Sequence, residues 1–133
     1  MYEELTKYIE LLDGDDYGHL VEQESPEENV VRDPIVEYSK TVQDFIKDIY
    51  KFMDDHEEVQ GIDYLKLTKG KRNKDGQPKY DELNALETYA FMLFPLRAAH
   101  FGNVTAPLAY LEQGIYLNLL KRLKELDNKR MKQ

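Results

Sequence analysis

The residues best spaced for chemistry lie between Asp13 and Glu24, where the pattern approaches that of a calcium-binding loop. With Asp13 as the first position, Asp15 falls third and Glu24 twelfth, as in an EF-hand. Gly18 falls at the sixth position, where that loop carries glycine. Tyr17, however, stands where an oxygen ligand belongs, and no clear amphipathic helix follows the loop. We therefore expect no calcium site, and no bound metal or cofactor in the protein.

The remaining acidic and histidine residues do not form a metal-binding pattern either. Residues 54–58 read Asp-Asp-His-Glu-Glu, but on a helix these side chains point in different directions. His19, His56 and His100 are isolated, and none has a second histidine four residues away, as a helical metal pair requires. The acidic run is more typical of a solvated helix end.

The sequence also lacks the common nucleophilic and phosphate-binding motifs. It contains no cysteine, which excludes thiol catalysis, cysteine-ligated zinc and iron–sulfur clusters. It contains no Gly-x-Ser-x-Gly elbow, no Walker A loop and no Gly-x-Gly-x-x-Gly fingerprint. We therefore predict no catalytic residues and a non-enzymatic protein.

The strongest structural signal is the apolar stretch from Asp81 to Phe101. Its apolar residues cover every face of a helix, so this helix must be buried on all sides by the rest of the chain. Pro95 lies inside it and removes the amide that would bond to the carbonyl of Phe91, which predicts a kink. The simplest interpretation is a bent core helix.

The bend at Pro95 also allows a functional interpretation, in which it opens a groove with Arg97 and His100 on its rim as candidate binding residues. A charged arginine beside so much apolar surface needs a partner. The acids that we expect to supply it are Glu87 or Glu112.

Helical periodicity continues on both sides of this central helix. Apolar residues repeat at helical spacing over residues 2–12 and 42–53, and Ser39 is the expected N-cap of the second of these helices. A short helix is expected over residues 105–114. Regularly spaced leucine and isoleucine residues predict a last helix over residues 115–126.

Two stretches break the helical pattern. Residues 14–38 contain two glycines and two prolines, which predict an irregular segment with room for one short extended pairing. Residues 66–80 are polar and basic, and they predict an exposed loop or ribbon. We therefore expect a single all-α domain over residues 1–133, a compact bundle of five or six helices around the buried, Pro-kinked central helix.

The net charge of −8 is distributed unevenly. Residues 1–65 are strongly acidic, whereas residues 66–80 carry six basic residues against one acidic residue. Because nucleic-acid binding is typical of basic domains, the acidic balance argues against direct nucleic-acid contact. We predict that the basic segment recognises a negatively charged partner, the other interpretations being pairing with the acidic half of the chain or ordinary solubility charge. Its candidate binding residues are Lys69, Lys71, Arg72 and Lys74.

The hydropathy pattern gives no sign of membrane contact. No basic region followed by an apolar one opens the chain, and no apolar run reaches the roughly 20 residues of a membrane span. The run over residues 85–101 comes closest, but four polar or helix-bending residues interrupt it. We expect a cytoplasmic protein, and the sequence leaves its oligomeric state open.

Several stretches occur in a recognisable order along the chain. They are Lys7 to Leu12, the turn Asp16-Tyr17-Gly18, Arg97-Ala98-Ala99-His100-Phe101, Leu111-Glu112-Gln113-Gly114-Ile115, and Leu120 to Leu126. This order resembles a family of small all-helical bacterial and phage domains of unknown function, over most of the chain except residues 66–80. The family pattern has Glu-Arg where this chain has Ala99 and His100. The resemblance implies a bacterial or phage origin and supplies no activity.

The features above favour a non-enzymatic, protein-binding domain with a protein partner. One alternative is a phage or mobile-element inhibitor of a host defence nuclease, whose acidic surface imitates the charge of nucleic acid. The other is a small enzyme that uses a groove near Pro95, with His100 as its acid–base group.

Overall fold

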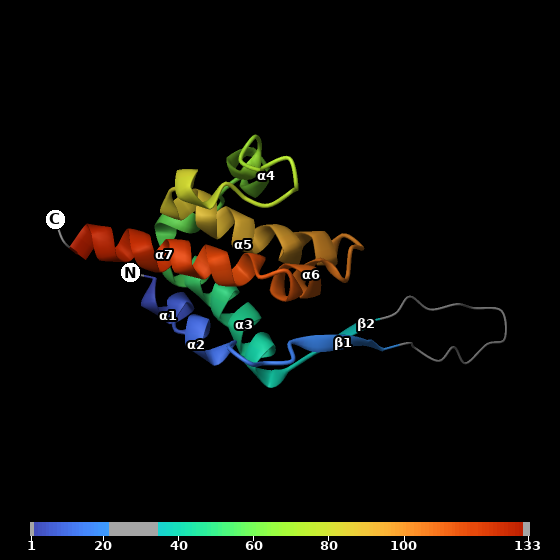
Figure 1. Ribbon diagram of the computed structural model, residues 1–133. Helices are drawn as coiled ribbons and strands as arrows, with labels where there is room; N and C mark the ends of the chain where they lie inside the picture. Colours follow the sequence, from blue (N-terminus) through green and yellow to red (C-terminus); the bar gives the residue numbers. More distant parts are fainter. Residues whose placement is uncertain (1, 22–34, 132–133) are drawn as a thin grey trace.

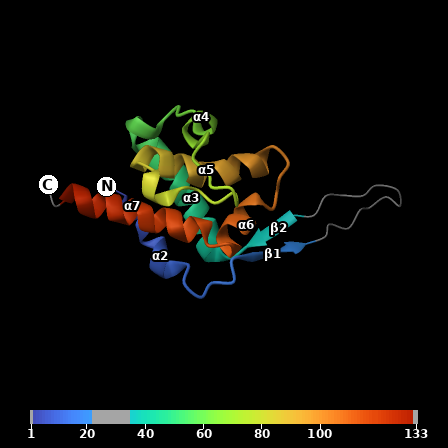
Figure 2. The same cartoon turned by 45° about the horizontal axis from the view of Figure 1, so that its top comes forward.

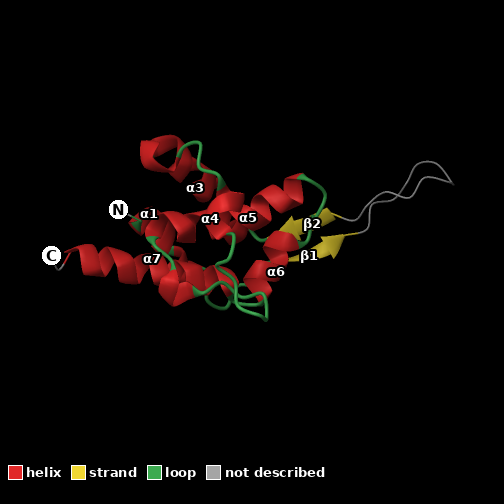
Figure 3. Cartoon of the chain, turned by 90° about the horizontal axis from the view of Figure 1, so that it is seen from above, coloured by secondary structure: helices red, strands yellow, loops and turns green. Residues whose placement is uncertain are grey.

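The computed structural model describes residues 2–21 and 35–131, which are mostly helical with one two-stranded antiparallel sheet (Figure 3). The elements in chain order are α1 (Glu3–Thr6), α2 (Tyr8–Leu11), β1 (Gly18–Val21), β2 (Ile35–Tyr38), α3 (Lys40–Asp55), the 3₁₀ turn η1 (Glu57–Val59), α4 (Tyr64–Thr68), the 3₁₀ turn η2 (Tyr80–Glu82), α5 (Ala85–His100), α6 (Ala106–Glu112) and α7 (Ile115–Met131). The prediction of a predominantly helical protein is confirmed, and the small sheet is an addition to it.

Helix α5 forms the centre of the core. Every residue from Thr88 to Leu93 is buried, which places all faces of this part of the helix against other elements. Those elements are α3, α4, α6 and α7. Figure 1 shows α7 running beside α5, and α4 lies against the N-terminal half of α5. The helix passes through Pro95 without interruption, and the kink expected there stays a prediction.

Helix α3 begins and packs as the sequence indicates. The Ser39 hydroxyl accepts a hydrogen bond from the amide of Val42 at 3.1 Å, which confirms Ser39 as the N-cap. The buried residues Val42, Phe45, Ile49 and Phe52 recur every three or four positions and form the stripe that faces the core.

The segment predicted to be irregular contains a β-hairpin. Strands β1 and β2 pair antiparallel, with Gly18 opposite Tyr38 and Val21 opposite Ile35 (Figure 2). A Cβ atom at Gly18 would lie only 2.4 Å from the carbonyl oxygen of Glu37, so a residue with a side chain does not fit there. The short extended pairing expected within residues 14–38 is therefore present between β1 and β2, while residues 22–34 lie outside the described residues.

The stretch proposed as a defective calcium loop instead connects α2 to this hairpin. The Asp15 carboxylate accepts hydrogen bonds from the Ser39 hydroxyl at 2.6 Å and from the Tyr17 amide at 3.0 Å. Tyr17 adopts a φ of 63°, a strained conformation for a residue other than glycine. Asp15 thus joins the start of the hairpin to the N-terminus of α3, and Glu24 lies outside the described residues.

The two ends of the described chain are also joined. The backbone amide of Tyr2 donates a buried hydrogen bond to the Asp127 carboxylate at 2.8 Å. Helix α1 packs against both α3 and α7, and Figure 1 shows it beside the C-terminal helix. The first helix is therefore held by the last one.

Candidate functional site

The basic segment at residues 66–80 begins within a helix and continues into a turn closed by a β-bridge. Its first residues belong to α4, which begins at the N-cap Asp63 and packs against α5. Arg72 and Pro78 then form an isolated antiparallel bridge, and the turn between them is closed by the Gly76 amide bonding to the Asn73 carbonyl at 3.0 Å. The bridged turn has the form of a short ribbon, and the segment departs from the expected loop or ribbon where Lys66 to Thr68 belong to α4.

Between α4 and the N-terminal part of α5 lies a surface pocket with a volume of about 420 Å³, which we call the α4–α5 pocket. Its lining combines three apolar and three basic side chains, namely Ile62, Leu67, Leu86, Lys66, Lys69 and Lys71. The apolar side chains are half-buried, whereas Lys66 and Lys69 are exposed. The pocket therefore offers an apolar surface bordered by positive charge.

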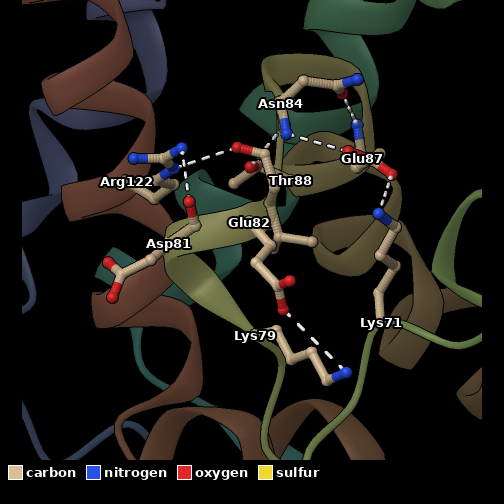
Figure 4. Close-up of polar contacts among 9 residues, drawn as sticks. Lys71, Lys79, Asp81, Glu82, Asn84, Glu87, Thr88 and Arg122 are labelled. Atoms are coloured by element: carbon tan, nitrogen blue, oxygen red, sulfur yellow. Dashed lines mark hydrogen bonds and ion pairs between the residues drawn. The ribbon is translucent and has the colours of Figure 1, made fainter.

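Two acids also line this pocket, and the fold uses both of them. Asp63 caps α4 by accepting a hydrogen bond from the Lys66 amide at 3.2 Å. Glu87 belongs to a capping box at the start of α5, in which its carboxylate accepts from the Asn84 amide at 2.9 Å and the Asn84 side chain accepts from the Glu87 amide at 2.8 Å. Figure 4 shows this reciprocal pair at the first turn of α5.

The second oxygen of the Glu87 carboxylate lies 3.4 Å from Lys71 Nζ. Glu87 is largely buried in this contact, with a side chain that is 13% exposed, so the ion pair fixes Lys71 against the wall of the pocket (Figure 4). Lys66 and Lys69, in contrast, form no ion pair with any residue that the structure describes. Their charges remain available to a partner.

Arg122 of α7 holds the chain that leads into α5. Its Nε donates to the carbonyl of Leu83 at 3.0 Å. Its Nη2 donates to the carbonyl of Asp81 at 3.1 Å, and Figure 4 shows Arg122 beside Asp81. Leu83 is fully buried directly before the capping box. The start of α5, and with it one wall of the pocket, is therefore anchored to α7.

Arg72 contacts the core instead of projecting from it. Its guanidinium carbon lies 4.9 Å from the centre of the Phe91 ring and 4.8 Å from that of Phe94. Its nitrogen atoms donate to the Tyr110 hydroxyl at 2.7 Å and to the Gly76 carbonyl at 3.0 Å. The prediction of an exposed Arg72 is wrong, since this side chain joins the basic segment to α5 and α6.

Lys74, the remaining predicted binding residue of this segment, is exposed in the turn beyond Arg72. It does not line the α4–α5 pocket. Of the four residues predicted for the basic segment, the structure thus brings only Lys69 and Lys71 together, and it adds Lys66 to them.

A second pocket lies beside the C-terminal half of α5, where a groove near Pro95 was expected. It has a volume of about 290 Å³ and a mainly apolar lining that includes Val36, Ile46, Tyr50, Leu96, Ala99 and Pro107. Arg97 and His100 are exposed and do not line it. Arg97 also does not receive Glu87 as its partner, because that carboxylate is held by Lys71 and Asn84.

The histidines are separated in space as they are in sequence. His56 stacks on Phe52 with ring centres 3.9 Å apart, His19 lies 3.5 Å from Glu37, and the His100 ring lies 5.3 Å from that of Phe101. Within the described ranges, no group of three or more histidine, aspartate or glutamate residues could hold a metal ion. Over the same residues, no helix is both long and apolar enough to cross a bilayer.

No protein-family model matches the chain, and no curated protein or solved structure is significantly similar to it.

Sequence reasoning missed Lys66 and the apolar side chains of the pocket. Asp63 is a good N-cap residue, Ile62 lies directly before it, and Leu67 lies in the short helix that follows. These signals were sufficient to predict a helix at residues 64–68. They could not indicate that this helix packs beside Leu86, which lies far along the chain.

Proposed function

We propose that this protein is a non-enzymatic binding domain that holds a protein partner in the α4–α5 pocket. The observation that carries the proposal is the combination in one pocket of half-buried apolar side chains with Lys66 and Lys69, two exposed cations that pair with no described acid. Apolar area gives a partner favourable burial, and the surrounding charge gives it orientation and selectivity.

The enzyme alternative receives less support from the same structure. A general acid–base group works in a site that brings it to a substrate and tunes its protonation. His100 instead lies exposed at the end of α5, with the ring of Phe101 as its nearest aromatic neighbour. His100 does not line the apolar pocket beside Leu96.

The inhibitor alternative requires an acidic face whose charge is free to act on a nuclease. On α3, however, Asp44 lies 2.6 Å from Lys40, and Asp48 lies 3.4 Å from Lys7. Such pairs mix the signs of charge along this helix, as an ordinary solvated face does. We therefore favour the pocket over the acidic surface, and we retain the cytoplasmic location and the bacterial or phage origin as proposals.

Site-specific photo-crosslinking in cells tests the proposal. The photoreactive amino acid p-benzoylphenylalanine replaces Leu65, which is 57% exposed on α4 directly beside Lys66. The matched control replaces Leu11, which is 54% exposed on α2, and Figure 1 shows these helices on opposite sides of the helical body. We expect a discrete conjugate from position 65 that is lost when Lys66→Glu and Lys69→Glu are added. The same conjugates from both positions, or none from position 65, would contradict the proposal.

A further inference from the structure

We infer that the segment that occupies the α4–α5 pocket is an acidic, amphipathic peptide, in which large apolar side chains lie between carboxylates. This inference rests on the proposed function and adds the chemistry of the partner to it. Three features of the pocket lead to it: its size and apolar surface, the state of its charged groups, and the different roles of its lysines.

The size and surface of the pocket suit side chains of a peptide. Its volume of about 420 Å³ falls in the range of roughly 300–1,000 Å³ that is usual for ligand pockets. Ile62 in the loop before α4, Leu67 in α4 and Leu86 in α5 provide the apolar contact area. A leucine or phenylalanine of a partner would bury these side chains, whereas a phosphate group or another small anion would leave them in water.

The charged groups of the pocket select a negative partner. Asp63 and Glu87 are already engaged by the helix caps, and Glu87 is engaged by Lys71 as well. A partner carboxylate therefore meets the free charges of Lys66 and Lys69. A partner with lysine or arginine at the same positions would face like charge, which costs affinity and slows encounter.

The three lysines of the pocket have different roles. Lys71 is held 3.4 Å from Glu87 and its side chain is 36% exposed, so it forms part of the wall. Lys66 lies in the last turn of α4 and Lys69 directly after that helix. The specificity for carboxylates is therefore assigned to Lys66 and Lys69, and only in a secondary way to Lys71.

Fluorescence anisotropy with the full chain and three labelled peptides of equal length tests this inference. The first peptide places glutamate around leucine at helical spacing, the second replaces each glutamate by lysine, and the third replaces each leucine by serine. We expect the first to bind about tenfold more tightly than either of the others, since it alone satisfies both the charge and the apolar surface. Its affinity should fall several-fold between about 50 mM and about 300 mM salt, because exposed charges are screened.

Charge variants locate the binding on the protein. The pair Lys66→Glu and Lys69→Glu should weaken binding of the first peptide by about tenfold or more, and the neutral pair Lys66→Gln and Lys69→Gln by less. The matched control is Lys74→Glu with Lys124→Glu, which makes the same change in net charge at two exposed residues outside the pocket. Circular dichroism melts of each variant are the control that it is folded. An equal loss in the control pair would overturn the assignment to this pocket.

Other results would overturn the inference in distinguishable ways. Equal binding of the serine peptide would show that charge alone acts, and equal binding of the lysine peptide would remove the charge selection. If sedimentation showed a dimer of the wild type that the Lys66→Glu and Lys69→Glu variant did not form, the occupant of the pocket would be a second copy of the chain. If the wild type bound phosphatidylserine vesicles and the same variant did not, the occupant of the pocket would be a membrane surface. A conjugate at position 65 without peptide binding would overturn this inference alone, whereas peptide binding without a conjugate would overturn the proposed function.

Discussion

The guanidinium carbon of Arg72 lies 4.8 Å from the centre of the Phe94 ring. Phe91 lies at nearly the same distance, so the cation rests on two aromatic rings of the central helix. A cation over an aromatic ring is attracted by the negative face of the ring. The most basic part of the chain is thus attached to its most apolar part.

Replacement of Arg72 should therefore reduce stability as a core substitution does. The change Arg72→Met keeps much of the aliphatic volume but removes the ring contacts and the hydrogen bond to Tyr110. We expect the free energy of unfolding to fall by about 1–3 kcal/mol, measured by urea denaturation. The exposed neighbour Lys74→Met is the control, and an equal effect of the two substitutions would show that Arg72 has no special role.

Leu86 and Leu93 of α5 should differ in their contribution to stability. Leu93 is 1% exposed in the core, and Leu93→Ala should cost about 2–5 kcal/mol. Leu86 is half-buried and lines the α4–α5 pocket, so Leu86→Ala should cost only about 1–2 kcal/mol because less area is lost from the folded state. Thermal and urea unfolding of the two variants give the comparison. Equal losses would contradict the burial of these side chains.

The capping box at the start of α5 should contribute to stability by its hydrogen bonds. Asn84→Ala removes the acceptor for the Glu87 amide and should lower the free energy of unfolding by about 0.5–2 kcal/mol. Asn84→Asp keeps an acceptor and should retain most of this free energy of unfolding. If alanine and aspartate at this position gave the same unfolding midpoint, the side-chain bond would contribute nothing.

Alkaline pH should destabilise the protein through Tyr38. Burial raises the pKa of Tyr38 to about 12, from about 10 in an unfolded chain. The folded state therefore holds the phenolic proton more tightly, and the stability that this provides is complete below about pH 10 and is lost towards about pH 12. Tyr38→Phe removes this proton. In urea unfolding at several pH values, the variant should lose stability less steeply than the wild type between these limits, and identical slopes would contradict the prediction.

The long helices could be predicted from the sequence because their signals are local. The burial of α5 follows from its apolar residues on all faces, and the start of α3 follows from Ser39 before an amphipathic stripe. The hairpin could be anticipated only as an extended pairing. Its register depends on contacts across the sheet, such as the close approach of Gly18 to Glu37, which no local pattern reveals.

The candidate site was predicted less completely, because its parts meet only in the folded chain. The charge of the basic segment identified Lys69 and Lys71, but it gave Arg72 the same exposed environment as its neighbours. The spacing of Asn84 and Glu87 is that of a capping box, but nothing in the sequence indicates that Glu87 also pairs with Lys71, nor that Arg72 lies against Phe91. A count of charges does not show which of them the fold itself uses.

The hydrogen bond between Tyr2 and Asp127 joins residues 125 positions apart. Because synthesis runs from the N-terminus, Tyr2 is made long before Asp127, and this bond must wait until nearly the whole described chain has emerged. Until α7 arrives, α5 also lacks one of the helices that cover its apolar surface. The nascent chain therefore presents this surface from the time that α5 emerges until α7 has followed it, and the described fold closes only after α7 has been made.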